Sequence, residues 1–451
     1  MKLLAAEYVV PVSSAPIENG AVAFENDRIV AVGTRRELAA RFPEAPLEDF
    51  GAAAITPGLI NTHSHLEITA MRGFLDTVEH DFYAWLMKLT TTRAEKLSEE
   101  DVKIAAIAGA LEGVRGGVTC FGDIGRFGAA GFAALKQNNL RGVLFQETEF
   151  APDNRTARED FEKLREKFLA LKETETKLVK VGLSPHAPYT VSPKLFELIA
   201  EYALSENVKT TIHVAESESE QELMTKGTGF FASVYAKYGF EWHSPLCTSV
   251  ELLERCGVLR SKPLLAHCVK VSENDVRLLA ENDARIAHCP KSNAKFGHGI
   301  APLERFLDAP IKVGFGSDSV ASNNACDILE EARFGALAAR TLPSKKRFIE
   351  PQQTFETATF GAAQALGLET EIGTLEAGKQ ADLAVFSLEN VAQMPVHDVY
   401  SALVFASGAR DVRLTMVAGE ELYLDGAAKK IDETELKMQM KIIAQKMRQT
   451  N

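Results

Sequence analysis

Short apolar runs alternate with longer amphipathic stretches through the middle of the chain, and this alternation constrains the fold more than any other feature. Eight apolar runs occur between Ala54 and Leu368: 54–61, 119–122, 142–147, 180–184, 210–215, 263–268, 285–289 and 311–316. Amphipathic stretches lie between them, among them 99–115, 158–172, 193–205, 218–238 and 273–282. This pattern is typical of parallel strands joined by crossover helices.

Eight strands is the number that closes a (β/α)8 ring. The sequence therefore predicts an α/β fold in which residues 54–368 form a TIM-type barrel. An open doubly wound sheet is the alternative, but no G-x-G-x-x-G follows the first run to support it. In a barrel, the residues just after each strand meet at one face, where the chemistry of such folds is found.

Both ends of the chain have a β-rich texture. Runs 2–10, 21–25 and 28–32 near the start resemble runs 381–387, 412–417 and 421–424 near the end. We predict one small β-sandwich domain built from residues 1–53 and 369–451, although two unrelated β extensions would leave the same pattern. The charged stretch 432–448 is expected to form a C-terminal helix that is a solvated cap or an oligomer contact, and we expect a homodimer.

Composition narrows the class of protein. The 50 Lys and Arg residues against 62 Asp and Glu residues give a net charge of −12, which opposes nucleic-acid binding. No apolar run approaches the ~20 residues that span a bilayer, and residues 1–11 are expected to form a strand and no signal peptide. The six cysteines are scattered without a C-x-x-C pair, so we expect free thiols and a cytoplasmic protein.

Histidines gather at the ends of the predicted barrel strands. His63 and His65 end the first run, and their i, i+2 spacing directs both imidazoles to one side of a strand. Other candidates follow later runs: His213, His267, His288 and Asp318. A hydrogen-bonded structural role is the alternative for each one alone, but five of the ten histidines lie at strand ends. Packing alone rarely explains such clustering, because buried imidazoles need polar partners.

Two histidines from one strand, a third histidine and a carboxylate form a suitable donor set for one borderline metal ion. We expect Zn²⁺, with Fe²⁺ and Mn²⁺ as alternatives. Such an ion lowers the pKa of water at an open position toward neutrality. Glu216 lies three residues past His213, in the loop, which suits a general acid or base more than a fourth ligand.

Several segments resemble the amidohydrolase superfamily, in its mononuclear nucleobase- and nucleoside-deaminase branch. The matching segments are PGLINTHSH (57–65), SPHAPY (184–189), IHVAE (212–216), AHC (266–268), HCPKSN (288–293), GIAP (299–302), GSDSVASNN (316–324) and GTLEAGKQADL (373–383). Within the branch they are most similar to aminodeoxyfutalosine deaminases and to S-adenosylhomocysteine/5′-methylthioadenosine deaminases. The latter carry a ribose-binding Glu about nine residues past the Trp, where this chain reads TTRA (91–94).

The resemblance implies a role for each matching residue. It implies a metal site formed by His63, His65, His213 and Asp318. Asp318 would also accept a proton, Glu216 would be the proton shuttle, and His267 would polarise the attacking water. Substrate contacts are expected at Glu67, Arg72, Trp85 and His186.

The implied activity is hydrolytic deamination of the adenine ring of a small nucleoside, with release of ammonia. Guanine deamination, or hydrolysis of a triazine or another cyclic amidine, is the alternative, because only the pocket separates these reactions. A scaffold protein without catalysis would be expected to lack part of the ligand set, which is complete here. Loop-capping roles are expected for Ser292, Asn293 and Asn323, and surface positions for His80, His243, His298 and His397.

Overall fold

The structure is a computed structural model that describes residues 1–343 and 346–448. Eight parallel strands form the central ring. They fall into two four-stranded sheets, ordered β6-β7-β8-β9 and β10-β11-β12-β13. Bridges Leu183–Thr210 and Ser64–Asp318 connect the two sheets at both seams. The strands are β6 (Leu59–Ser64), β7 (Val118–Gly125), β8 (Arg141–Glu147), β9 (Val179–Ser184), β10 (Thr211–Val214), β11 (Leu264–His267), β12 (Arg285–His288) and β13 (Lys312–Phe315).

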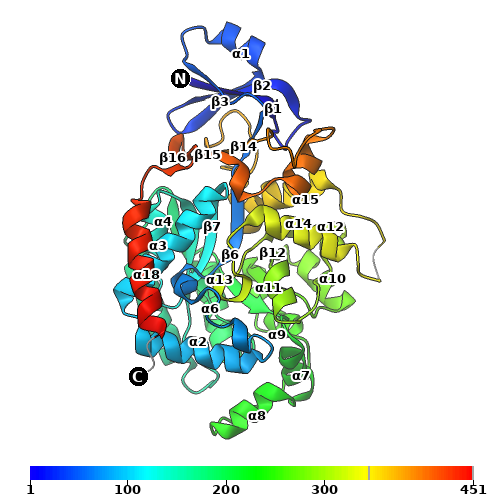
Figure 1. Ribbon diagram of the computed structural model, residues 1–451. Helices are drawn as coiled ribbons and strands as arrows, with labels where there is room; N and C mark the ends of the chain where they lie inside the picture. The colour runs from blue at the N-terminus through cyan, green and yellow to red at the C-terminus, as the bar shows by residue number, and fades with distance from the viewer. Residues whose placement is uncertain (344–345, 449–451) are drawn as a thin grey trace.

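Helices surround the ring and cover its open end. The larger ones are α2 (Phe82–Lys96), α3 (Glu99–Arg115), α4 (Ala129–Gln137), α5 (Ala157–Lys172), α6 (Pro193–Ser205), α7 (Glu218–Lys226), α8 (Phe230–Lys237), α10 (Glu273–Glu281), α14 (Ile328–Ala339), α15 (Pro351–Ala358) and α18 (Glu433–Arg448). Shorter ones are α9 (Ser249–Arg255), α11 (Pro290–Lys295), α12 (Leu303–Asp308), α13 (Val320–Asn323), α16 (Phe360–Leu366) and α17 (Val399–Ser401). Figure 1 shows α2, α7 and α8 at the end of the barrel opposite the N-terminus.

A second sheet takes strands from both ends of the chain. Its order is β17-β16-β15-β14-β5-β1-β2-β3, with β4 paired to β1. Alternate residues of β1 pack on opposite faces: Leu4 and Ala6 in the main core of this sheet, Leu3 and Ala5 against helix α1 (Arg35–Arg41). The strands are β1 (Lys2–Val9), β2 (Ile17–Glu25), β3 (Arg28–Thr34), β4 (Leu47–Asp49), β5 (Ala53–Pro57), β14 (Leu383–Ser387), β15 (Val412–Val417), β16 (Glu420–Leu424) and β17 (Ala427–Ala428).

The terminal sheet is attached to the barrel by a buried ion pair. Arg141, at the start of β8, donates from Nε to Asp382 Oδ2 at 2.7 Å and from Nη2 to Oδ1 at 3.1 Å. Further along the barrel, α18 runs down the side of α3 (Figure 1), and Lys446 bonds both oxygens of Asp101. The predicted C-terminal helix therefore packs within its own chain, with Ile443 buried against the residues of α2.

Two predicted elements are wrong in detail. The run 54–61 is two strands: β5 pairs with β1 and β14 in the terminal sheet, and β6 enters the barrel after Gly58. The stretch 218–238 is two helices, because Gly227 and Gly229 take φ values of 68° and 86° that end one helix before the next begins. The predicted fold class, a TIM-type barrel with a small β domain, is confirmed.

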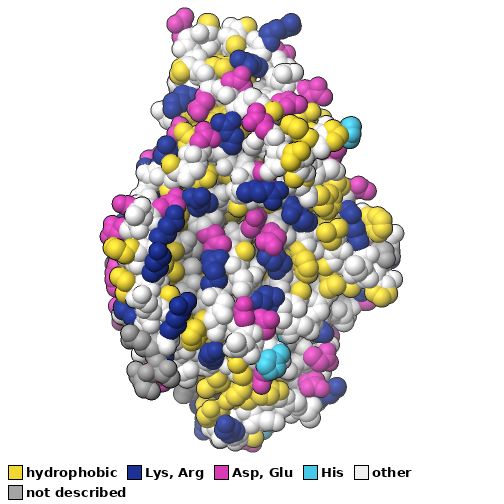
Figure 2. Space-filling view, viewed as in Figure 1, with side chains coloured by type: hydrophobic (Ala, Val, Ile, Leu, Met, Phe, Trp, Pro, Cys, Tyr) yellow, Lys and Arg dark blue, Asp and Glu magenta, His cyan; other side chains and the backbone are white. Residues whose placement is uncertain are grey.

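The described residues contain no helix long and apolar enough to cross a membrane. All six cysteines are buried and unpaired, as the sequence predicted. Acidic and basic side chains are interspersed over the face seen in Figure 2, and hydrophobic side chains gather at the end where α2 and α8 lie. That end is where the carboxyl ends of the barrel strands meet.

Candidate active site

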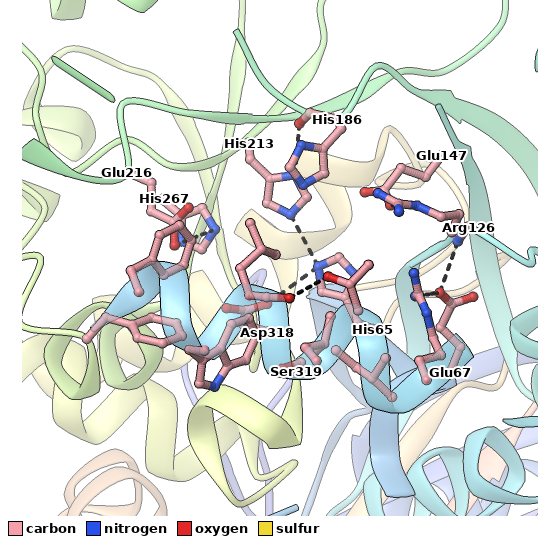
Figure 3. Close-up of a pocket in the computed structure, with 18 of the residues that line it drawn as sticks. His65, Glu67, Arg126, Glu147, His186, His213, Glu216, His267, Asp318 and Ser319 are labelled. Atoms are coloured by element: carbon pink, nitrogen blue, oxygen red, sulfur yellow. Dashed lines mark hydrogen bonds and ion pairs between the residues drawn. The ribbon is translucent and has the colours of Figure 1, made fainter. Parts of the chain in front are cut away.

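Three imidazoles and one carboxylate converge at the carboxyl end of the barrel. His63 and His65 lie on or directly after β6, His213 lies on β10, and Asp318 follows β13. His65 Nε2 is 3.2 Å from His213 Nε2 and 3.5 Å from Asp318 Oδ1 (Figure 3). Asp318 Oδ1 also lies 3.4 Å from His63 Nε2. The structure thus brings together the four side chains that the sequence predicted as ligands.

The electrostatics of this cluster fit a divalent cation. Burial lowers the pKa of His63 to about 4 and that of His65 to about 3, so both rings are neutral at pH 7. Although burial opposes its charge, the neighbouring imidazole of His63 holds the pKa of Asp318 well below its usual value. Neither ring nitrogen of His63 has a hydrogen-bond partner among the described residues. Neutral imidazoles beside one carboxylate form a donor set that suits a divalent metal ion.

The backbone at the strand ends is held in a conformation that favours glycine. Asp318 has φ 55° and His267 has φ 73°, positions that cost a residue with a Cβ about 1–3 kcal/mol. Gly316 permits the close approach of β13 to β6, because a Cβ there would lie 2.7 Å from the Cβ of His63. Two residues that carry the candidate chemistry are thus held in a strained backbone conformation.

Hydrogen bonds from neighbouring loops orient Asp318 and His267. Ser292 and Ser322 both donate to Asp318 Oδ2, at 2.6 and 3.1 Å, which leaves Oδ1 facing the imidazoles. Asn293 Oδ1 lies 2.9 Å from His267 Nδ1, so that nitrogen carries the proton and Nε2 is the acceptor facing the pocket. Ser292 and Asn293, predicted to cap loops, therefore contact site residues directly.

Asn323 is the third residue that was predicted to cap a loop, and its side chain does form a hydrogen bond within its own loop. Its Nδ2 donates to the carbonyl of Ser317 and to Glu331 Oε1, both at 2.5 Å.

Glu216 lies beside His267, away from the four clustered donors. Its Oε1 is 3.8 Å from His267 Nε2 and 3.6 Å from His298 Nε2. Burial raises the pKa of Glu216 to about 7, so this carboxyl can gain and lose a proton near neutral pH. The prediction that His298 lies on the surface is wrong, because it is buried against Phe82 and Phe296. His80, His243 and His397 are exposed, as predicted.

Aromatic side chains form one wall of the pocket. Phe82 and Trp85 of α2 are stacked with centroids 6.1 Å apart, and Phe296 meets Trp85 edge-on at 5.0 Å. Tyr189 and His186, from the loop after β9, line the same cavity. His186 bonds Thr190 through Nδ1, while its carbonyl accepts from the His213 ring. Trp85 and His186, both predicted as substrate contacts, therefore line this cavity.

Charged side chains line the other end of the pocket (Figure 3). They are Glu67 of the 3-10 segment Leu66–Met71, Arg93 of α2, Arg126 after β7 and Glu147 at the end of β8. Sequence reasoning named only Glu67 among them. Glu147 is the last residue of the predicted strand 142–147. Its position at a strand end could therefore have predicted that it lies in the site.

Arg72 does not reach this pocket, contrary to the prediction of a substrate contact. Its guanidinium pairs with Glu112 of α3 and donates to the carbonyl of Asn324 at 2.6 Å. It does not line the cavity in the described part of the chain. The chain turns away after the segment Leu66–Met71, and proximity in sequence to His65 misled the prediction.

A barrel that gathers imidazoles and a carboxylate at its strand ends defines a class of metal-dependent hydrolases. A model of the amidohydrolase family matches residues 54–422, and one of an imidazolonepropionase-like composite domain of bacteria matches residues 20–45. The chain belongs to the amidohydrolase family.

Individual relatives cover nearly the whole chain. A 5-methylthioadenosine/S-adenosylhomocysteine deaminase of Moorella thermoacetica is 33% identical over 450 residues, 96% of each chain. Among solved structures, an adenosine deaminase from Xanthomonas campestris with bound zinc is similar with a TM-score of 0.87 and 28% identity, over 99% of this chain and 98% of that one. Atrazine chlorohydrolase from Arthrobacter aurescens, complexed with zinc, shares the fold with a TM-score of 0.84 and 23% identity, over 98% and 100% of the two chains.

Proposed function

We propose that this protein is a metal-dependent hydrolase that deaminates the adenine ring of a small nucleoside and releases ammonia. The observation that carries the proposal is the convergence of His63, His65, His213 and Asp318 beside a buried, separate carboxyl, Glu216. Relatives named as deaminases of adenine nucleosides support the substrate class.

The four clustered side chains would hold one Zn²⁺ ion, and the free nitrogens of His63 fit that role. When bound, the ion would supply a Lewis acid that lowers the pKa of water at the reacting carbon. Zinc in two solved relatives supports this choice over Fe²⁺ or Mn²⁺.

The chain's own residues would move the protons. Glu216, with a pKa near 7, donates a proton to the ring nitrogen next to the carbon that carries the amino group. Ionised Asp318 accepts a proton from the attacking water and passes it to the departing amine. As the amine leaves, Glu216 takes back a proton from the new hydroxyl, and the ring carbonyl forms. His267, whose Nε2 is an acceptor, orients that water. The aromatic wall of Phe82, Trp85 and Phe296 offers a flat surface for a purine.

An ultraviolet deamination screen tests the proposal. Purified protein, loaded with zinc, is offered adenosine, methylthioadenosine, adenosylhomocysteine, aminodeoxyfutalosine, guanine and a triazine. We expect turnover of at least one adenine nucleoside, with the preferred compound identifying the 5′-substituent. Inertness toward every adenine nucleoside, with activity on guanine or a triazine, would reject it.

A further inference from the structure

The two carboxylates at the charged end of the pocket differ in how many partners they have. Both oxygens of Glu67 have partners: Oε1 accepts from Arg93 Nη1 at 2.9 Å and from the Arg126 amide at 3.1 Å, and Oε2 accepts from the Phe127 amide at 3.0 Å. The sequence predicted Glu67 as a substrate contact, and the structure places it in the pocket lining with both oxygens bonded to the protein. It holds the loop after β7 in place.

Glu147, by contrast, has one carboxylate oxygen without a hydrogen-bond partner among the described residues. Only 7% of the residue is exposed, and its buried Oε1 has no hydrogen-bond partner within residues 1–343 and 346–448. Its Oε2 is 3.6 Å from Arg126 Nε, a buried donor that also has no hydrogen bond there. Both residues line the pocket, and Figure 3 shows them side by side at the end away from Glu216. A buried acceptor and a buried donor without hydrogen bonds destabilise the folded protein unless a ligand forms a hydrogen bond with each of them.

A second cation is a poor candidate for that ligand. Oxygen and nitrogen atoms of Glu147, His186 and His213 do lie within 4.8 Å of one another. However, His213 already belongs to the first cluster, and the Arg126 guanidinium beside Glu147 would repel a cation. The site instead suits a neutral group that donates and accepts hydrogen bonds at adjacent atoms. Two neighbouring hydroxyls of a sugar have this property.

We infer that Glu147 and Arg126 form a subsite for the vicinal hydroxyl pair of the substrate's sugar. This inference rests on the proposed function, since it needs a nucleoside in the pocket. Glu147 Oε1 accepts from one or both hydroxyls, and Arg126 Nε donates to one of them. Glu147 and Arg126 are specificity-determining residues that touch the sugar and take no part in proton transfer.

Deoxygenated substrates test the inference without changing the protein. The adenine nucleoside that the wild type turns over fastest is compared with its 2′,3′-dideoxy analogue. We expect kcat/KM to fall roughly ten- to a hundredfold on loss of the hydroxyls, the range for hydrogen bonds to charged groups. In Glu147→Gln the ratio between the two substrates shrinks to a few-fold, because the hydroxylated substrate alone loses rate. Arg126→Gln changes the ratio in the same direction.

Glu149→Gln is the matched control. Glu149 lies 3.8 Å from Arg126 Nε but is exposed and pairs with Lys167, so the substrate ratio stays at the wild-type value. Equal wild-type rates on both substrates, or an unchanged ratio in Glu147→Gln, would overturn the inference while leaving the deaminase proposal intact. Two metal ions per chain, falling to one in Glu147→Gln, would overturn it in favour of a cation site. Inertness toward all adenine nucleosides would instead reject the proposed function.

Discussion

The two ends of the pocket are built from different parts of the fold. At the reacting end, the clustered donors lie on β6 and β10 or directly after β6 and β13, elements that the closed ring fixes relative to one another. At the charged end, Glu67, Arg93 and Arg126 come from a 3-10 segment, a covering helix and a loop. Only Glu147 lies on a barrel strand there.

This difference in construction suggests that the strand ends carry out the reaction and that the loops and covering helix select the substrate. Strand ends in a closed barrel hold their side chains in fixed positions, which suits a donor cluster that tolerates little displacement. Loops and covering helices can vary in sequence without disturbing the ring, which suits contacts that select a substrate. We therefore expect changes at the reacting end to affect turnover, and changes at the charged end to affect stability and substrate choice.

The largest expected effect is the loss of turnover in Glu216→Gln. General acid–base groups contribute about 10²–10⁴-fold to rate, and glutamine cannot transfer the proton. Steady-state kinetics should detect a fall in kcat within that range, while metal content stays at the wild-type level. The exposed Glu218, two residues further on, gives the control: Glu218→Gln should keep wild-type kcat. A wild-type rate in Glu216→Gln would show that the proton moves by another route.

At the charged end, Arg93→Gln should cost stability. It would leave the Glu67 carboxylate buried beside two amides without its cation, and breaking a buried pair costs about 3–5 kcal/mol. Urea unfolding should report a loss of that order, with metal content unchanged. Arg72→Gln breaks a more exposed pair and should cost no more than about 1 kcal/mol. Equal losses of unfolding free energy in the two variants would show that the buried pair contributes no more to stability than the exposed one.

A smaller effect is expected where a loop supports the reacting end. Asn293→Ala removes the acceptor that fixes the proton on His267 Nδ1. Loss of one hydrogen bond of about 1–1.5 kcal/mol corresponds to roughly tenfold in rate. We expect kcat to fall about tenfold with little change in KM. A change in KM alone would mean that Asn293 contacts substrate and does not orient His267.

Per pH unit, the smallest effect is a pH dependence of stability. Burial raises the pKa of Glu331, which bonds Asn323 behind the reacting end, to about 8. Because the folded state holds this proton more tightly than the unfolded state, its contribution is full below pH ~4.5 and is lost as pH rises toward 8. The free energy of unfolding should therefore fall with rising pH, by at most about 1.4 kcal/mol per pH unit from this group. Glu331→Gln should flatten that slope; an unchanged slope would exclude Glu331 as its source.

The sequence predicted the reacting end because parallel strands bring their carboxyl ends to one face. Once the barrel was inferred, position alone placed His63, His65, His213 and Asp318 among the candidates at that face. The family resemblance then singled out these four from the other strand-end histidines. The charged end had no such rule. Arg93 reaches the pocket because α2 folds across the barrel mouth, and His298 is buried by residues that come from that same helix and its own loop. Neither placement leaves a periodic signal in the sequence.

The proposed chemistry depends on one divalent ion held by three imidazoles and one aspartate. Elemental analysis of the purified protein, loaded with zinc and then dialysed, measures it directly. We expect one ion per chain in the wild type and in Glu216→Gln, and close to none in His65→Ala or Asp318→Asn. A wild-type protein that retains no stoichiometric ion, or ligand variants that keep a full equivalent, would show that these four side chains do not hold a metal.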